Sequence, residues 1–177
     1  STPRPGWRCG TRRRWRPMRD TWETTMKDYG STRNPTAPYQ CFMGRWEGLT
    51  KTFGPDGAFL GCTAVHMDVY WVGESTWHLH EEFDQLWETQ SRQVYESDMR
   101  VEGNNCFADN ALIKVLGTGI TAYNYNFIID SAVSKSLVLN NHYFLDPDTR
   151  RIITHKLRDG KTTIFQIQDF VRVLRPT

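Results

Sequence analysis

From residue 42 onward the sequence is a succession of short segments in which apolar and polar residues alternate, and turn-forming residues separate these segments. A period of two is typical of β-strands that bury one face. The clearest turns are Gly54-Pro55-Asp56-Gly57 and Asp159-Gly160. The pattern predicts eight to ten antiparallel strands joined by hairpins. Strands in this number close into an up-and-down barrel that leaves no exposed edge, and a β-sandwich is the alternative.

The predicted strands follow these segments, with one region left open. Residues 106–116 fit either a short strand or a helical turn. Gly117 and Gly119 are expected to lead into the strand that follows them. The strands are expected at 42–53, 58–72, 76–87, 92–101, 120–129, 133–145, 151–157, 162–168 and 170–175.

The first part of the chain differs in composition, and we expect residues 1–38 to form an extension and residues 39–177 to form the β-barrel domain. Residues 1–19 are rich in proline, glycine and arginine, which is typical of an extended arm. Residues 20–29 predict a short helix, because Trp22, Met26 and Tyr29 would share one helical face. The fold class predicted is therefore mainly β, with one short N-terminal helix.

The segment Phe42-Met43-Gly44-Arg45-Trp46-Glu47-Gly48 places an indole between two glycines on an alternating strand. Glycines beside a large ring let a strand bend and leave room for that ring. This segment resembles the Gly-x-Trp start of the first strand in lipocalin-like, or calycin, β-barrels. The resemblance implies that Trp46, two residues after Gly44, plugs the closed end of the barrel. It also implies that an arginine of the last strand, Arg172 or Arg175, lies across the indole in a cation–π contact.

The same segment, followed by Phe53-Gly54-Pro55-Asp56-Gly57, is similar to plastid and cyanobacterial lipocalin-like proteins, including relatives of the bilin lyases. An eight-stranded barrel has room for packed side chains or for one small ligand. The sequence contains no recognisable nucleophile elbow, phosphate-binding loop or dinucleotide fingerprint. No acid/base pair inside a barrel can be read from the pattern, so we expect a protein that is not an enzyme, with a lyase-like activity as an alternative.

Aromatic residues make up 13% of the chain, which is more than a barrel plug requires. A barrel lined by such residues could hold a lipid, a porphyrin-like pigment or a bilin as its cofactor or cargo. Simple filling of the core is the other interpretation. The candidate ligand-lining residues are Trp71, Trp77, Tyr123, Tyr125, Phe127 and Tyr143.

Positive charge is concentrated in the extension, although the whole chain carries a net charge of only +2. Such an arm favours a negatively charged partner, and its tryptophans and arginines are favoured anchors in protein grooves. Because the rest of the chain is acidic, we expect no dedicated binding of nucleic acid, and instead a protein complex or a membrane surface as the partner. The candidate docking residues are Trp7, Arg8, Arg12, Arg13, Arg14, Trp15, Arg16 and Arg19.

Metal binding is not expected. His78, His80 and Glu82 share one strand face and match the ligand types of an iron or zinc site. No second half of such a site follows, so a polar outward face is the preferred interpretation. Cys9, Cys41, Cys62 and Cys106 lack the spacing of a metal knuckle or of a Cys-x-x-Cys motif. We expect reduced, buried thiols, with a disulfide as the alternative.

These expectations combine into one functional hypothesis. The protein would be a non-enzymatic accessory subunit of a large photosynthetic or respiratory assembly, docked through its basic arm. No apolar run approaches the ~18 residues that span a bilayer, so the chain would not be transmembrane. The arginine-rich, acid-poor start resembles an organelle transit peptide and favours the chloroplast or the mitochondrion. The alternatives are a carrier of a small apolar ligand and a bilin-lyase-like enzyme.

Overall fold

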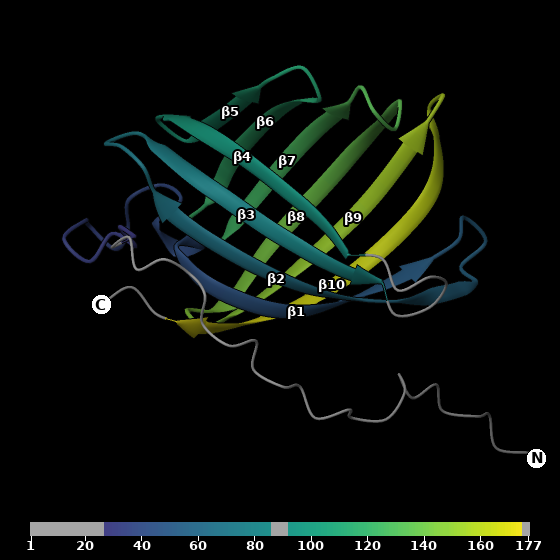
Figure 1. Cartoon of the computed structure of the whole chain (residues 1–177), viewed down its shortest axis with the longest axis horizontal. Helices are drawn as coiled ribbons and strands as arrows, with labels where there is room; N and C mark the ends of the chain where they lie inside the picture. Colours follow the sequence, from purple (N-terminus) through teal and green to yellow (C-terminus); the bar gives the residue numbers. More distant parts are fainter. Residues whose placement is uncertain (1–26, 86–91, 175–177) are drawn as a thin grey trace, which may run out of the picture.

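The computed structural model describes residues 27–85 and 92–174, and within them ten antiparallel strands close into a barrel (Figure 1). Each strand pairs with its neighbours in sequence, and the last strand returns to the first, so that Gly48 lies opposite Phe170. The up-and-down barrel predicted from the alternation is confirmed, and the β-sandwich is excluded. The strands are β1 (Gly44–Phe53), β2 (Phe59–Trp71), β3 (Thr76–Gln85), β4 (Arg92–Glu102), β5 (Asn105–Asp109), β6 (Ile113–Thr121), β7 (Asn124–Ser131), β8 (Ser136–Asp146), β9 (Thr149–Arg158) and β10 (Lys161–Leu174).

The undecided region 106–116 contains the end of one strand and the start of another. The side chain of Asn110 accepts hydrogen bonds from the backbone N–H groups of Leu112 and Ile113, which turns the chain between β5 and β6. Gly117 and Gly119 lie inside β6 rather than before a new strand. A Cβ at Gly117 would lie 2.5 Å from Cys106 Sγ and 2.6 Å from Phe127 Cε1, so this position has room for glycine alone. Likewise, the segments expected at 162–168 and 170–175 form the single strand β10.

The predicted N-terminal helix is not supported. Most of residues 20–29 lie outside the described part of the chain, and residues 27–29 are not helical. Asp28 instead forms an isolated β-bridge with Trp71, whose backbone N–H donates to the Asp28 carbonyl oxygen at 2.7 Å. Trp71 is the last residue of β2, and because β1 begins opposite Val69, the edge of β2 at Trp71 is available to the backbone of Asp28. The only helical turn in the described residues is the 3-10 turn η1 (Gln40–Phe42).

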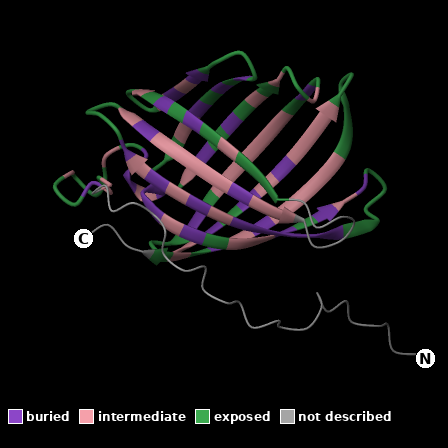
Figure 2. Cartoon of the chain, in the orientation of Figure 1, coloured by how far each residue is buried: buried purple, intermediate pink, exposed green. Residues whose placement is uncertain are grey.

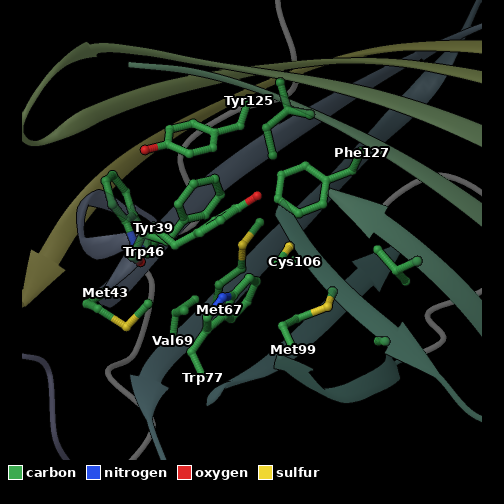
Figure 3. Close-up of a cluster of buried hydrophobic side chains, with 14 of the residues drawn as sticks. Tyr39, Met43, Trp46, Met67, Val69, Trp77, Met99, Cys106, Tyr125 and Phe127 are labelled. Carbon is green, nitrogen blue, oxygen red and sulfur yellow. The ribbon is translucent and has the colours of Figure 1, made fainter. Parts of the chain in front are cut away.

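The hydrophobic core gathers at one end of the barrel, where Tyr39, Trp46, Trp77, Tyr125 and Phe127 converge (Figure 3). The ring centroids of Tyr39 and Tyr125 are 5.0 Å apart, a separation typical of favourable aromatic pairs. Burial alternates along the strands, as Figure 2 shows for the walls of the barrel. The η1 turn inserts Phe42 among these rings and thereby closes this end.

No helix in the described residues has the length and hydrophobicity needed to cross a bilayer.

Candidate ligand-binding site

A cavity of about 520 Å³ occupies the barrel interior beyond the closed end. The lining side chains come from β2, β3, β4 and from β6 to β10, and along β3, β7, β8 and β9 they are alternate residues, as the pleat requires. On β3 these are Trp77, Leu79, Glu81 and Phe83, and most of the other lining side chains are apolar. The lining also includes Leu112, Val133 and Ser134, from the loops at the end of the barrel opposite Trp46. The volume lies within the range of small-molecule pockets, roughly 300–1,000 Å³.

Arg150, the second residue of β9, lies at the floor of this cavity and is only 2% exposed. Its guanidinium carbon is 4.7 Å from the ring centroid of Trp46 and 5.3 Å from that of Phe42. Nη2 donates to the thioether of Met67 at 2.9 Å, and Nε has no hydrogen-bond partner. Burial lowers the pKa of Arg150 to about 10. No carboxylate of the described residues forms an ion pair with it, and the one carboxylate whose charge raises the pKa of Arg150 is that of Glu81.

Two further buried nitrogens of the cavity lining also lack a hydrogen-bond partner among the described residues. They are Nε1 of Trp77 and Nδ1 of His142. Burial and the neighbouring Arg150 hold the pKa of His142 well below its ordinary value, so the imidazole is neutral. Unsatisfied buried polar atoms in a native fold call for a partner such as a water molecule or a ligand.

Glu81 is the one carboxylate of the cavity lining. Desolvation by burial raises the pKa of Glu81 to about 7, although the positive charge of Arg150 acts in the opposite direction. Its side chain makes no hydrogen bond or ion pair within the described residues. The cavity lining therefore contains two basic side chains, Arg150 at the floor and Lys156 further along β9, and one carboxyl group, Glu81, that changes charge near neutral pH.

The closed end holds the residues named by the Gly-x-Trp motif. The structure places the Arg172 guanidinium carbon 4.4 Å from the ring centroid of Trp46. Arg172 also donates to the carbonyl oxygens of Cys41, at 2.9 Å, and of Met43, which ties the η1 turn to β10. Gly44 has a φ of 127°, a conformation that other residues rarely adopt. The second candidate arginine, Arg175, lies outside the described residues.

Of the six candidate ligand-lining residues, Trp77 and Phe127 line the cavity. Trp71 and Tyr125 are buried at the closed end without lining it, whereas Tyr123 and Tyr143 are 59% and 40% exposed. The prediction was wrong for these four, because aromatic content alone does not tell which face of a strand, or which depth in the barrel, a ring occupies.

Sequence reasoning missed Glu81, His142 and Arg150. A signal for Glu81 existed, since it alternates with the inward residues Leu79 and Phe83 and is thus a carboxylate on an otherwise apolar face. Arg150 starts the alternating series Arg150, Ile152, Thr154, but β9 lies far from β3 in the sequence. Only the closure of the barrel shows that these groups share one cavity.

The remaining candidate residues lie elsewhere. His78 Nδ1 is 2.6 Å from Asp98 Oδ1, and His80 pairs with Glu82 and Glu96 on the outer wall. The described residues contain no group of three or more His, Cys, Asp or Glu side chains arranged to hold a metal. The docking candidates of the arm, from Trp7 to Arg19, lie outside the described residues.

The cysteines differ from one another. Cys41 and Cys106 are free thiols, as expected. Cys62, in contrast, is disulfide-bonded, so the expectation of a reduced thiol was wrong for this residue. Sequence spacing does not report which thiols the folded chain brings together. Cys9 lies outside the described residues.

No protein-family model matches the sequence, and a comparison with curated proteins gives no match either. Solved structures do match. The S-type phycobiliprotein lyase CPES of Guillardia theta is 11% identical with a TM-score of 0.62, over 76% of this chain and 89% of that one. A protein of unknown function from the DUF3598 family of Nostoc punctiforme is 14% identical with a TM-score of 0.64, over 79% of this chain and 51% of that one. The chain thus has the lipocalin-like, calycin-type barrel fold of a phycobiliprotein lyase, as its Gly-x-Trp segment predicted.

Proposed function

We propose that this protein binds a small, largely apolar molecule inside its barrel, with an anionic end of that molecule against Arg150. The observation that carries the proposal is the buried guanidinium at the cavity floor, which forms no ion pair within the described residues and whose Nε has no hydrogen-bond partner. The apolar walls and the volume of about 520 Å³ suit the rest of such a ligand. Fatty acids and carboxylated pigments such as bilins belong to this class.

The physical argument concerns the cost of an unpaired buried charge. Taking an ion out of water costs several kcal/mol unless a counterion or hydrogen bonds compensate. The aromatic rings around Arg150 offset part of this cost, roughly 0.5–2 kcal/mol for each favourable cation–π contact. The rings do not provide a hydrogen-bond acceptor for Nε of Arg150, which has no partner. A ligand carboxylate would supply both the missing charge and the missing acceptor, in the bidentate geometry that guanidinium groups favour.

A bilin-lyase-like activity is the second candidate. It is supported by the fold shared with a phycobiliprotein lyase and by Glu81, a cavity carboxyl whose pKa of about 7 suits proton transfer at neutral pH. Incubation with an open-chain tetrapyrrole and an acceptor apoprotein, followed by denaturing electrophoresis, would separate covalent transfer from simple binding. A carrier gives no attached pigment, whereas a lyase does.

Docking on a large organelle assembly remains a separate hypothesis. It rests on the composition of residues 1–19, which lie outside the described residues, and it is compatible with ligand binding by the barrel. The chloroplast or mitochondrial location has the same basis.

The binding proposal is tested with palmitate and hexadecanol, which have the same chain length and differ in the anionic group. We expect the purified protein to prefer palmitate, and the preference to disappear in Arg150→Met. Arg151→Gln is the matched control, because Arg151 is the next residue of β9 and pairs with Asp169 on the outside. Equal affinity for both molecules in the unmodified protein would contradict the proposal.

A further inference from the structure

We propose that Glu81 selects ligands that carry an N–H donor along their length, in addition to the anionic end held by Arg150. This inference rests on the proposed function and narrows its ligand class. It assigns a specificity-determining role to a side chain that neither the Gly-x-Trp motif nor the aromatic content indicates.

The first argument is the position of Glu81 along the barrel. Trp77 lines the closed-end part of the cavity near the start of β3, and Glu81 lies four residues further along the same inward face. Four residues of strand advance by about 13 Å. The register partner of Glu81 on β2 is Met67, whose thioether accepts a hydrogen bond from Arg150, so a molecule held at Arg150 passes close to the carboxyl group of Glu81. The adjacent strands present Met67 and Tyr95 beside it, since these residues pair with Glu81 in the sheet register.

The second argument is the chemistry of an unpartnered carboxyl group. Among the described residues Glu81 has no hydrogen bond and no ion pair, and its neighbours on the inward face are Leu79 and Phe83. A hydrocarbon chain packed here would bury the carboxylate without a donor, which is unfavourable. A ligand N–H pointing at Glu81 would supply a charge-assisted hydrogen bond, which is among the stronger kinds.

The third argument concerns the other charges in the cavity. The titratable side chains that line it are Glu81, Tyr95, His142, Arg150 and Lys156. His142 is neutral, and Tyr95 has a raised pKa caused mainly by burial. Glu81 is thus the only acceptor among these five that gains a negative charge near neutral pH. With Glu81 ionised, the cavity is arranged for a ligand with an anion at one end and donors further along.

The test compares two probes: biliverdin, which carries propionate carboxylates and has N–H groups on its pyrrole-type rings, and palmitate, which carries a carboxylate and has no N–H group. Each Kd is measured at pH 6 and pH 8 for the unmodified protein and for Glu81→Gln. For each probe and each pH, we take the ratio of the Kd of Glu81→Gln to the Kd of the unmodified protein. This ratio cancels any effect of pH on the charge of the probe itself. Glu47→Gln is the control, since Glu47 lies on the outward face of β1 and is 54% exposed. Circular dichroism confirms that each variant is folded.

For biliverdin at pH 8, Glu81→Gln should weaken binding by about tenfold, as the loss of a charge-assisted hydrogen bond predicts. The effect should shrink at pH 6, where Glu81 is mostly protonated. For palmitate at pH 8 the same variant should strengthen binding, because the ionised group opposite the hydrocarbon is gone. If the ratio of the variant Kd to the unmodified Kd is the same for biliverdin and palmitate, the role of Glu81 is overturned, while the proposal that the barrel binds a ligand stands. Failure of both probes to bind the unmodified protein would instead overturn the proposed function.

Discussion

The guanidinium of Arg150 lies 4.7 Å from the ring centroid of Trp46, on the cavity side of the residue that closes the barrel. Arg172 contacts the same indole from β10, with its guanidinium carbon 4.4 Å from the ring centroid. Trp46 therefore packs against two cations, one that ties the η1 turn to the last strand and one that faces the cavity. The plug of the barrel and the floor of its binding site are thus one structural unit.

Trp46→Ala should lower the free energy of unfolding by about 3–5 kcal/mol, because the ring is fully buried among aromatic neighbours. Urea denaturation measures this. Tyr143→Ala is the control, since Tyr143 is 40% exposed, and it should cost far less. A loss below about 1 kcal/mol for Trp46→Ala would show that the closed end does not depend on its plug.

Arg150→Met should leave the free energy of unfolding of the ligand-free protein unchanged or raise it. Replacing an unpaired buried ion by an apolar side chain is often neutral or stabilising, by about 1–4 kcal/mol at most. The same variant should lose the preference for palmitate over hexadecanol. Strong destabilisation without any effect on binding would show that Arg150 is a structural residue only.

Gly117→Ala should destabilise the barrel by about 1–3 kcal/mol, the usual cost of overpacking. An added Cβ would lie 2.5 Å from Cys106 Sγ and 2.6 Å from the Phe127 ring. Gly73→Ala provides the comparison, because its nearest neighbour would be 4.0 Å away, at Thr76. Thermal melts of the two variants should separate clearly, and equal melting temperatures would contradict the close approach at Gly117.

The pKa of Glu81 makes stability depend on pH in a defined direction. Its pKa is raised to about 7 in the folded chain, from 4.5, so the native state holds the proton more tightly than the unfolded state. The contribution of Glu81 to the free energy of unfolding is therefore fully present below about pH 4.5. It decreases as the pH rises toward 7, by at most about 1.4 kcal/mol per pH unit. Glu81→Gln should be more stable than the unmodified protein at pH 8, and this difference should vanish near pH 4. A difference that is independent of pH would contradict the raised pKa.

The docking hypothesis predicts that neutralising the arm abolishes association with a large complex. Replacing Arg12, Arg13, Arg14 and Arg16 by glutamine should leave the melting temperature of the barrel unchanged. Native-mass measurement of protein from its source tests co-migration with an assembly, and Arg151→Gln on the barrel wall is the control. If the neutralised protein still associates fully with the complex, the arm is not the docking element, and the docking surface lies on the barrel.

The sequence by itself determined the barrel and its closed end. Alternation and turn residues are local properties, and each strand reports its own buried face without reference to distant parts of the chain. The Gly-x-Trp segment is equally local, because Gly44 marks a position where the backbone adopts a positive φ next to the indole of Trp46. For these reasons the type of barrel and the place of Trp46 could be read from the residues, whereas the division of 106–116 between β5 and β6 and the single strand β10 could not.

Only the tertiary structure decided the binding site. Glu81, His142 and Arg150 come from β3, β8 and β9, and their shared cavity exists because the barrel closes around it. Tertiary pairing likewise replaced the helical pattern near Asp28 by a bridge to Trp71. The alternation of a strand indicates which face each side chain takes. The depth of a side chain along the barrel, its burial and the distant charges near it depend on how all ten strands pack together.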